Sequence, residues 1–518
     1  MIYLKKIRVV VSLLFFVLTS IIFLDFINII PTELYDYILF LQFVPSVINF
    51  IDILAIASIG FFIVLILVIL FGRVYCSSVC PVGTLQDVIS NISNKITGEH
   101  FYNWSKELKW LRYSILILTV LSIPVLGILL VGLLDPLSNF GRILSNLIRP
   151  LIILLNNFLA LFLELMGSYI IYPVDIMGFS IAGFIFSFII LTTLLLMSIK
   201  RGRLFCNTIC PLGTLLGLIS KVSIFKIKIN EDECDSCGMC SAVCKAECIN
   251  DDSKEIDFER CVVCFNCIRE CPTSAINYYK EHYTKQNSET EFSKSRRNFL
   301  SNFYSFVVGI SGMGFIQVQI IPEKESTKPV NRLAPVSPPG SKNVEHYNST
   351  CTACHLCISV CPTQVLQPSI LHYGLEGFLQ PRMDYITNFC KYDCVLCTEV
   401  CPSGALQKIL PENKKLIQLG KSKFVKENCI VETEKKACGA CSEVCPTKAV
   451  RMIPYENKLQ IPEVKNEYCV GCGACEYACP TIPYKAIYVE GNPEHLKAEI
   501  PPAEKQEQEI DYKEEFPF

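Results

Sequence analysis

Long apolar runs separated by polar loops fill the first 225 residues of the chain. Four of these runs are long enough to cross a bilayer as helices. They lie at about 9–30, 53–71, 113–134 and 179–199. A further apolar stretch, 147–172, is predicted to be an interfacial or re-entrant helix, because another span would move the basic residues after the fourth run to the opposite side. The pattern predicts a four-span α-helical membrane domain over residues 1–225.

Basic residues gather at one end of each predicted span. Those beside the first and second spans are Lys5, Lys6, Arg8 and Arg73. Those beside the third and fourth are Lys106, Lys109, Arg112, Lys200, Arg201 and Arg203. Because cytoplasmic loops carry an excess of Lys and Arg, the N-terminus and the segment after the fourth span are predicted to be cytoplasmic.

Two segments of this domain repeat each other almost position for position. Residues 72–85 read GRVYCSSVCPVGTL and residues 202–215 read GRLFCNTICPLGTL. Cysteines four residues apart share a helix face, and a proline after the second suits the start of a new helix. The second cysteine of each pair would then lie at a positive helix end, which favours thiolate. The four thiols, Cys76, Cys80, Cys206 and Cys210, could converge on one metal or small cluster, or could be structural or transiently oxidised thiols.

Residues 230–282 carry two cysteine runs with the spacing C-x2-C-x2-C-x3-C, which is typical of ferredoxins that hold two [4Fe-4S] clusters. A zinc ribbon would show isolated C-x2-C hooks instead. The last cysteine of each run is expected to complete the cluster of the other run. The expected ligand sets are Cys234, Cys237, Cys240 and Cys271, and Cys261, Cys264, Cys267 and Cys244. Cys248 is expected to be a packing residue, and Lys245 stands where other runs have proline.

Residues 345–490 carry four more runs, each ending in Cys-Pro. They are Cys351, Cys354, Cys357 and Cys361; Cys390, Cys394, Cys397 and Cys401; Cys429, Cys438, Cys441 and Cys445; and Cys469, Cys472, Cys475 and Cys479. The middle two open with longer gaps, which favours a nested pairing of first with fourth and second with third, although sequential pairing is open. A linker at 323–344 precedes this domain, and a flexible tail at 491–518 follows.

Cys351, Cys354 and His355 match the haem-attachment pattern C-x-x-C-H. Both cysteines already belong to a complete ferredoxin-type run, so a haem is not expected.

A paired arginine, Arg296-Arg297, precedes Phe299-Leu300 and a moderately apolar run at 303–321. In the segment 293–322 this pattern is typical of a twin-arginine export signal, which moves folded cargo. The following domain would need such a route, because its clusters are inserted before export. The same arginines also fit the cytoplasmic end of an ordinary membrane helix.

Composition narrows the class of protein. The chain has 29 cysteines and 51% hydrophobic but only 19% charged residues, which suits a membrane protein. A net charge of −2 argues against a nucleic-acid partner. None of its six histidines lies in a predicted span, which excludes a bis-histidine haem within the bilayer.

The two Cys-x3-Cys-Pro repeats, the four spans and the ferredoxin segment at 230–282 resemble NapH, the membrane ferredoxin-type subunit of periplasmic nitrate reductase systems, and MauN of methylamine utilisation. Arg296-Arg297 followed by four cysteine runs is similar to NapG and its MauM relative. The chain looks like the two types fused.

The resemblance implies an inner-membrane electron-transfer protein of quinol dehydrogenase type. Electrons would pass from membrane quinol through six [4Fe-4S] clusters to a periplasmic reductase or multihaem cytochrome. Since quinol oxidation releases protons, Asp135, Glu164 and Asp175 are candidate acceptors, or else solvate a loop. The membrane repeats also resemble a regulator of nitrous-oxide respiration and a copper-handling assembly protein, which leaves open a metal reductase or maturation protein.

The expected fold is therefore multidomain. It combines an α-helical membrane domain of four spans, one twin-arginine-type span and two α+β bacterial-ferredoxin-like polycluster domains. The first ferredoxin domain is expected in the cytoplasm and the second in the periplasm.

Overall fold

The computed structural model describes residues 2–53, 59–98, 102–106, 108–250, 253–280, 327–330 and 332–500 of the chain. Arg296-Arg297 and the segment 293–322 lie outside the described residues, as does the chain from 501 onward. The twin-arginine signal therefore stays a prediction.

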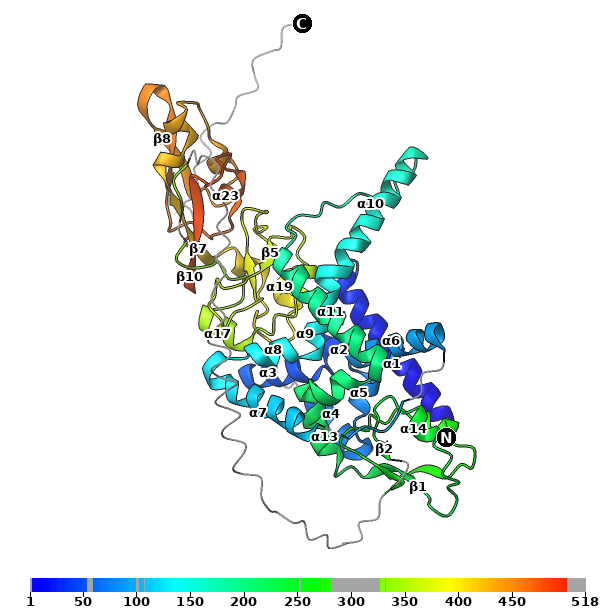
Figure 1. Cartoon of the computed structure of the whole chain (residues 1–518). Coiled ribbons are helices and arrows are strands. Elements are labelled where there is room, and N and C mark those ends of the chain that lie inside the picture. The colour runs from blue at the N-terminus through cyan, green and yellow to red at the C-terminus, as the bar shows by residue number, and fades with distance from the viewer. Residues whose placement is uncertain are drawn as a thin grey trace.

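Helix α1 (Ile2–Leu24) extends from one cysteine-rich domain to the other (Figure 1). It contacts α15 (Asn266–Glu270) of the first domain and α18 (Leu356–Ser359) of the second. Lys5, in its first turns, interacts electrostatically with Cys264. Its 23 residues correspond to about 35 Å, slightly more than the roughly 30 Å of a bilayer core.

Helix α11 (Ile181–Arg201) runs in the opposite direction between the same two domains. Near its start, a Cβ at Gly183 would lie 3.2 Å from Pro368 of the second domain. Just after its end, a Cβ at Gly202 would lie 2.7 Å from the Lys245 carbonyl oxygen of the first. The two cysteine-rich domains therefore lie at opposite ends of helices of bilayer length.

Four described helices are long and apolar enough to cross a membrane. They are Tyr3–Leu24, Lys109–Leu126, Pro136–Leu165 and Ile181–Arg201. The first, second and fourth correspond to the predicted runs at 9–30, 113–134 and 179–199. A short helix, α8 (Leu129–Leu134), follows the second of them after a break and packs back against it.

The predicted span at 53–71 is wrong as a single helix. α3 (Phe43–Ile53) ends where that run begins, and α4 (Gly60–Phe71) starts afresh. The rings of Phe50 and Phe61 lie 5.3 Å apart, so α4 packs back against α3. α3 also forms a pair bent by 113° with α2 (Glu33–Leu39), a broken or re-entrant arrangement.

The predicted interfacial helix at 147–172 has different bounds. α9 (Pro136–Ile143), a π-helical turn (Leu144–Ile148) and α10 (Arg149–Leu165) form one continuous helix. Asp135 caps its start, where its carboxylate accepts a hydrogen bond from the Ser138 amide at 2.8 Å. By length and composition this helix is itself a candidate span, and α10 projects away from the other helices (Figure 1).

The first cysteine-rich domain has the expected α+β form. Strand β1 (Phe225–Ile229) pairs antiparallel with β4 (Ile276–Lys280), and β2 (Ile249–Asn250) pairs with β3 (Glu255–Ile256). The helices α14 (Met239–Ala242) and α15 pack together between these sheets.

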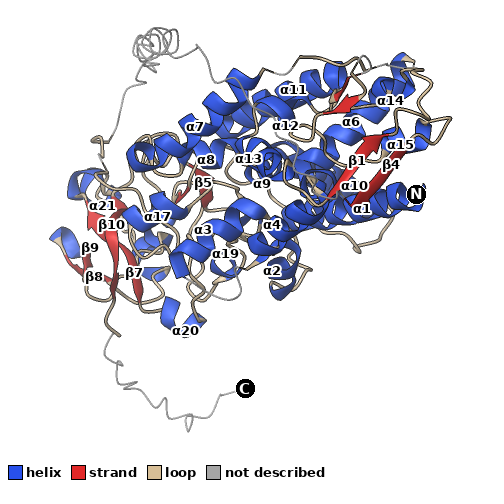
Figure 2. Cartoon of the chain, turned by 90° about the horizontal axis from the view of Figure 1, so that it is seen from below, coloured by secondary structure: helices blue, strands red, loops and turns tan. Residues whose placement is uncertain are grey.

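The second cysteine-rich domain contains three two-stranded antiparallel sheets and short helices. In Figure 2, β7, β8, β9 and β10 lie at the end of the molecule away from the N-terminus, and β5 lies farther in. The strand pairs are β5 (Leu366–Pro368) with β6 (Pro381–Met383), β7 (Ile417–Phe424) with β10 (Ile487–Lys497), and β8 (Val450–Pro454) with β9 (Gln460–Val464). The helices are α17 (Val344–Thr350), α18, α19 (Leu396–Glu399), α20 (Pro411–Lys414), α21 (Ile430–Thr433), α22 (Ala440–Glu443) and α23 (Ala474–Ala478).

Two predicted boundaries of this domain are wrong. The tail was expected from residue 491, but β10 continues to Lys497, where Leu496 pairs with Gln418. The linker was expected to reach residue 344, but Arg332 forms an ion pair with Glu476 and Val336 is buried. Pairing and burial in the folded domain override the polar, proline-rich composition of both segments.

Asp87 of α6 (Pro81–Thr97) fixes the first cysteine-rich domain to the membrane helices. Its carboxylate accepts hydrogen bonds from Arg203 Nε and Nη2 at 3.0 and 2.8 Å, and forms ion pairs with Arg8 at 3.2 Å and Lys245 at 3.6 Å. Burial opposes its ionisation, but Arg203 and the other two cations outweigh burial and hold the pKa of Asp87 well below its usual value. Lys245 thus adds an anchor that proline would not supply.

We expect Asp87→Asn to lower the free energy of unfolding of the full chain by about 3–5 kcal/mol, because it leaves buried cations without their carboxylate. The stabilisation from a depressed pKa is complete above about pH 4 and is lost as the pH falls further. Denaturation of the purified chain at pH 7 and pH 3 measures both effects. The control is Asp232→Asn in an exposed loop. Equal stability of both variants and wild type would contradict this role.

Candidate metal centres

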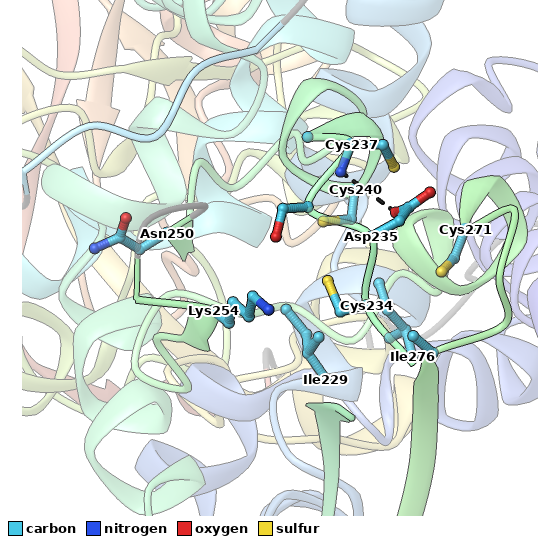
Figure 3. A pocket seen from close by; sticks show the side chains of 12 residues that line it. Ile229, Cys234, Asp235, Cys237, Cys240, Asn250, Lys254, Cys271 and Ile276 are labelled. Carbon is cyan, nitrogen blue, oxygen red and sulfur yellow. Dashed lines mark hydrogen bonds between the residues drawn. The ribbon is translucent and has the colours of Figure 1, made fainter. Parts of the chain in front are cut away.

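The first cysteine-rich domain forms a cavity lined by Cys234, Cys237, Cys240 and Cys271 (Figure 3). Cys234 and Cys237 come from the loop before α14, Cys240 lies in α14 itself, and Cys271 directly follows α15 in the other run. Ile229 and Ile276 supply an apolar wall. Four thiols around one hollow match the donor set of a cubane.

The second quartet of this domain is Cys244, Cys261, Cys264 and Cys267, whose thiols interact electrostatically. Burial, followed by these neighbours, raises the pKa of Cys267. Both quartets have the grouping expected from the spacing, and iron binding by them stays a prediction. Cys248 is 2% exposed, and its sulfur lies 3.5 Å from Cys244 Sγ within the domain core.

In the second cysteine-rich domain the runs pair sequentially, so the nested pairing is wrong. The Cys401 thiol interacts electrostatically with Cys351, Cys354 and Cys357, and α18 packs on α19. The reciprocal quartet is Cys390, Cys394, Cys397 and Cys361.

The third and fourth runs form the other two quartets. Cys429, Cys438, Cys441 and Cys479 line one cavity. The remaining quartet is Cys469, Cys472, Cys475 and Cys445. The long gap after Cys429 is occupied by the helical turn α21, so it lengthens the loop without changing the partner.

The membrane repeats fold into two matching units. In the first, α5 (Val74–Ser78) carries Cys76, and Cys80 is the N-cap of α6. In the second, α12 (Leu204–Thr208) carries Cys206, and Cys210 is the N-cap of α13 (Pro211–Ser220). The prediction that proline starts a helix is confirmed. The expectation of one shared helix face is wrong, because the chain leaves the short helix before the second cysteine of each pair.

Two buried arginines lock the units to each other. Arg73 Nη2 donates to the carbonyl oxygen of Cys206 at 3.2 Å, and Arg203 Nη1 donates to that of Cys76. A Cβ at Gly83 would collide with the Cys76 carbonyl, and one at Gly213 with the Cys206 carbonyl. Each glycine therefore lets its helix approach the cysteine carbonyl of its own repeat. The arginine of the other repeat donates a hydrogen bond to that same carbonyl.

The four membrane-repeat thiols come together in the protein interior. Each cysteine is 4–5% exposed, and Cys80 interacts electrostatically with Cys206, Cys76 and Cys210. Burial raises the pKa of Cys80 and of Cys210, and it raises that of Cys206 to about 11 although Arg203 opposes the shift. The expectation that the helix ends favour free thiolate is therefore wrong, because burial outweighs them. Within the described residues no three His, Cys, Asp or Glu side chains are close enough to hold a single metal ion.

The second cysteine-rich domain docks on α8 and α9 through the loop that carries its first quartet. Arg142, which is 0% exposed, donates to the carbonyl oxygens of Ala353 at 2.9 Å and Thr352 at 3.3 Å. A Cβ at Gly132 would lie 2.8 Å from the Thr352 carbonyl oxygen, so glycine is needed for this approach. The sequence does not predict this contact, for which its one signal is an arginine within an apolar stretch.

His355 completes this interface and has no free ring nitrogen. Its Nε2 lies 3.0 Å from the Leu379 carbonyl oxygen and its Nδ1 lies 3.1 Å from Asn146 Nδ2. Burial, followed by Arg142, lowers the pKa of His355 to about 3, so the ring is neutral. Both nitrogens are engaged in structural contacts.

Asp135 and Asp175 have structural partners in this region. Asp135 caps α9, and the carbonyl oxygen of Asp175 accepts a hydrogen bond from Gln364 at 2.8 Å. Proton acceptance by Asp135, Glu164 or Asp175 stays a prediction.

Three family models match four segments of the chain. A 4Fe-4S binding domain matches residues 53–98 and 183–230, which contain the two membrane repeats. 4Fe-4S dicluster domains match residues 350–406, which contain the whole of the first sequential pair of runs, and residues 436–482, which contain all of the second pair except Cys429. The chain therefore carries multiple 4Fe-4S sites.

The chain is 28% identical over 217 residues to the putative electron transport protein YccM of Escherichia coli, covering 41% of this chain and 52% of that protein. It is 26% identical over 225 residues to the ferredoxin-type protein NapH of Haemophilus influenzae, covering 42% and 65%. It is 29% identical over 174 residues to the methylamine utilization ferredoxin-type protein MauN of Paracoccus denitrificans, covering 33% and 48%.

The chain thus spans between about half and two thirds of the length of these curated relatives. The predicted resemblance to NapH and MauN is confirmed. An iron–sulfur electron-transport protein of this type is supported, and its apolar helices are consistent with an inner-membrane protein.

Sequential pairing predicts which double variants share a cluster. Cys351→Ser with Cys401→Ser is expected to remove one cubane, about four irons per chain, because both thiols belong to one quartet. Cys351→Ser with Cys479→Ser is expected to remove two cubanes, about eight irons. Iron analysis of the anaerobically purified chains gives the measurement. A loss of about eight irons in the first double variant and about four in the second would support the nested pairing instead.

Proposed function

We propose that this protein is a membrane-bound electron-transfer protein of quinol dehydrogenase type. It passes electrons from membrane quinol through six [4Fe-4S] clusters to a periplasmic reductase or multihaem cytochrome. The observation that carries the proposal is the placement of the cysteine quartets in two domains, at opposite ends of helices of bilayer length.

The thiols present fit the clusters in number and placement. Each quartet takes three cysteines from one run and the fourth from its partner run. Two quartets line cavities where, among the described residues, Asp235 is the one further lining residue of the types His, Cys, Asp or Glu. A cubane supplies one-electron storage at each such position, and the thiolates hold its irons. The chain itself sets the order of the clusters.

Contacts between quartets support a linear order in the second domain. The Cys390 amide donates to the Cys472 carbonyl oxygen at 2.9 Å, which joins the quartet of Cys390 to that of Cys469. The quartet that contains Cys351 lies next to the membrane helices. The cavity that contains Cys429 belongs to the pair of the third and fourth runs, which is farther from these helices. Electrons would therefore leave the protein from the pair farthest from the membrane.

The proposed topology follows from the basic residues. Arg8, Arg112 and Arg203 all lie against the first cysteine-rich domain or its anchor: Arg112 forms an ion pair with Glu259 at 3.5 Å, and the other two meet Asp87. The positive-inside rule then puts this domain in the cytoplasm and the second one in the periplasm. Arg296 and Arg297, as a twin-arginine signal, would direct the export of the second domain across the membrane.

A second candidate function is suggested by the four buried cysteines of the membrane repeats, since cysteine sulfur is a soft ligand that suits cuprous ion. The protein would then reduce or hold copper for the maturation of another enzyme. The four quartets of the second domain favour electron transfer, because a maturation protein has no need of so long a chain of centres.

Reduced menaquinol or ubiquinol analogue is expected to reduce the clusters of the purified protein. EPR spectroscopy under anaerobic conditions measures the signals of reduced cubanes, and dithionite provides the fully reduced reference. Full reduction by dithionite without any reduction by either quinol would falsify the quinol step.

Arg296→Lys with Arg297→Lys is expected to leave the second cysteine-rich domain in the cytoplasm. The exchange keeps the positive charge, so an ordinary membrane helix would insert as before, whereas a twin-arginine signal would fail. Protease accessibility in spheroplasts measures the outcome, with Lys294→Arg as the matched control. Unchanged cleavage from the periplasmic side would rule out the twin-arginine route.

A further inference from the structure

We propose that the four membrane-repeat thiols hold a [4Fe-4S] cluster that relays electrons between the two cysteine-rich domains, so that the chain conducts electrons directly from one face of the membrane to the other. The thiols are those of Cys76, Cys80, Cys206 and Cys210. The proposal rests on the proposed function for the clusters in the flanking quartets, but it does not require quinol.

Arg73 points to a bound anion at this position. It is 0% exposed, and in the described part of the chain it meets carbonyl oxygens and Asn207 but no carboxylate. Its Nε has no hydrogen-bond partner among the described residues, and its Nη2 lies 3.9 Å from Cys76 Sγ. A buried cation without a counter-ion costs several kcal/mol. Metal-bound thiolates supply the missing negative charge, whereas neutral thiols or disulfides would not.

The quartet is joined directly to the first cysteine-rich domain. Arg73 Nη1 donates to the Glu259 carbonyl oxygen at 2.8 Å, two residues before Cys261. The Arg203 amide donates to the Lys245 carbonyl oxygen at 2.9 Å, next to Cys244. The loops that carry the flanking quartet therefore lie in hydrogen-bonding contact with the loops that carry the membrane thiols.

A single helix separates the quartet from the second cysteine-rich domain. α6, which begins after Cys80, packs against α9, and α9 holds the cysteine loop of the second domain through Arg142. Tyr75 interacts electrostatically with both Cys80 and Asp135, and Asp135 interacts with Cys354. A helix with its side chains is about 10–12 Å across, so the gap is about that width.

The medium between the centres is packed protein. One hydrophobic core contains Cys76, Cys80 and Cys210, and both Cys264 of the first domain and Cys354 of the second pack against it. Without a redox centre at the membrane repeats, an electron would have to cross this core in a single step. A cluster at the membrane repeats would replace that step by two shorter ones.

The electron balance is simple. A soluble one-electron donor of ferredoxin type reduces the outer quartet of the first domain, where Cys237 is exposed. Each cluster on the path gains one electron and passes it on, so the donor is oxidised and an acceptor beyond the second domain is reduced. No proton or bond is transferred, and each electron that crosses moves one negative charge through the membrane.

The test uses the full chain in liposomes that enclose ferricyanide, with vesicles selected for an outward-facing first domain by an N-terminal tag. Reduced soluble ferredoxin is added outside, and the loss of ferricyanide absorbance inside is followed. Wild type is expected to transfer electrons. Cys76→Ser with Cys206→Ser is expected to reduce the rate at least tenfold and to lose about four irons per chain. Ser78→Ala, which changes a half-buried side chain of α5 and leaves every quartet complete, is the matched control and should change neither.

Three results would overturn the relay: wild-type rates in the Cys76→Ser, Cys206→Ser chain, unchanged iron content in that chain, or no transfer by wild type although its outer clusters are reduced. Loss of copper rather than iron would also overturn it and favour maturation. Quinol-dependent cluster reduction is measured separately on the same preparations. Its failure counts against the quinol step alone, and its persistence in the double variant leaves the proposed function intact.

A milder variant keeps all thiols. Arg73→Gln removes one buried positive charge beside the quartet, so the reduction potential of a single cluster is expected to fall, while Arg73→Lys restores most of it. Redox titration monitored by EPR measures each cluster. If no signal shifts in Arg73→Gln, no redox centre lies beside Arg73.

Discussion

The reciprocal hydrogen bonds between the two membrane repeats are the constraint on which the rest of the structure depends. Arg73 binds the Cys206 carbonyl and Arg203 binds the Cys76 carbonyl, so neither cysteine loop closes without the other. Both guanidinium groups are 0% exposed, yet only Arg203 has a carboxylate partner, Asp87, in the described residues. Asp87 balances the charge of Arg203, whereas the charge of Arg73 is not balanced in this way. The four thiols therefore lie beside a net positive charge.

The same chemistry recurs where the second domain docks. Arg142 binds two carbonyl oxygens of the loop that carries Cys351 and Cys354, as Arg73 binds that of Cys206. In both places a buried cation meets backbone oxygens beside cysteines, so each junction orients a loop and also stabilises added negative charge. If clusters occupy these cysteines as proposed, their binding and the assembly of the domains depend on the same arginines.

Local patterns in the sequence predicted much of the site. They did not predict which distant segments pack together. The spacing within runs predicted the grouping of Cys271 with Cys234, and the prolines after Cys80 and Cys210 predicted helix starts, because both depend on neighbouring residues. Pairing among the four later runs was predicted wrongly, since spacing within a run carries no information on its partner. The span at 53–71 failed for a similar reason: apolar composition did not reveal that α4 folds back on α3.

Electron cryomicroscopy of the anaerobically purified chain is the most direct test for a cluster at the membrane repeats. The proposed relay predicts density for a cluster enclosed by Cys76, Cys80, Cys206 and Cys210. This density should lie between the quartets of the first and the second cysteine-rich domain. Disulfide bonds, a single ion or unoccupied thiols at that position would contradict the central claim.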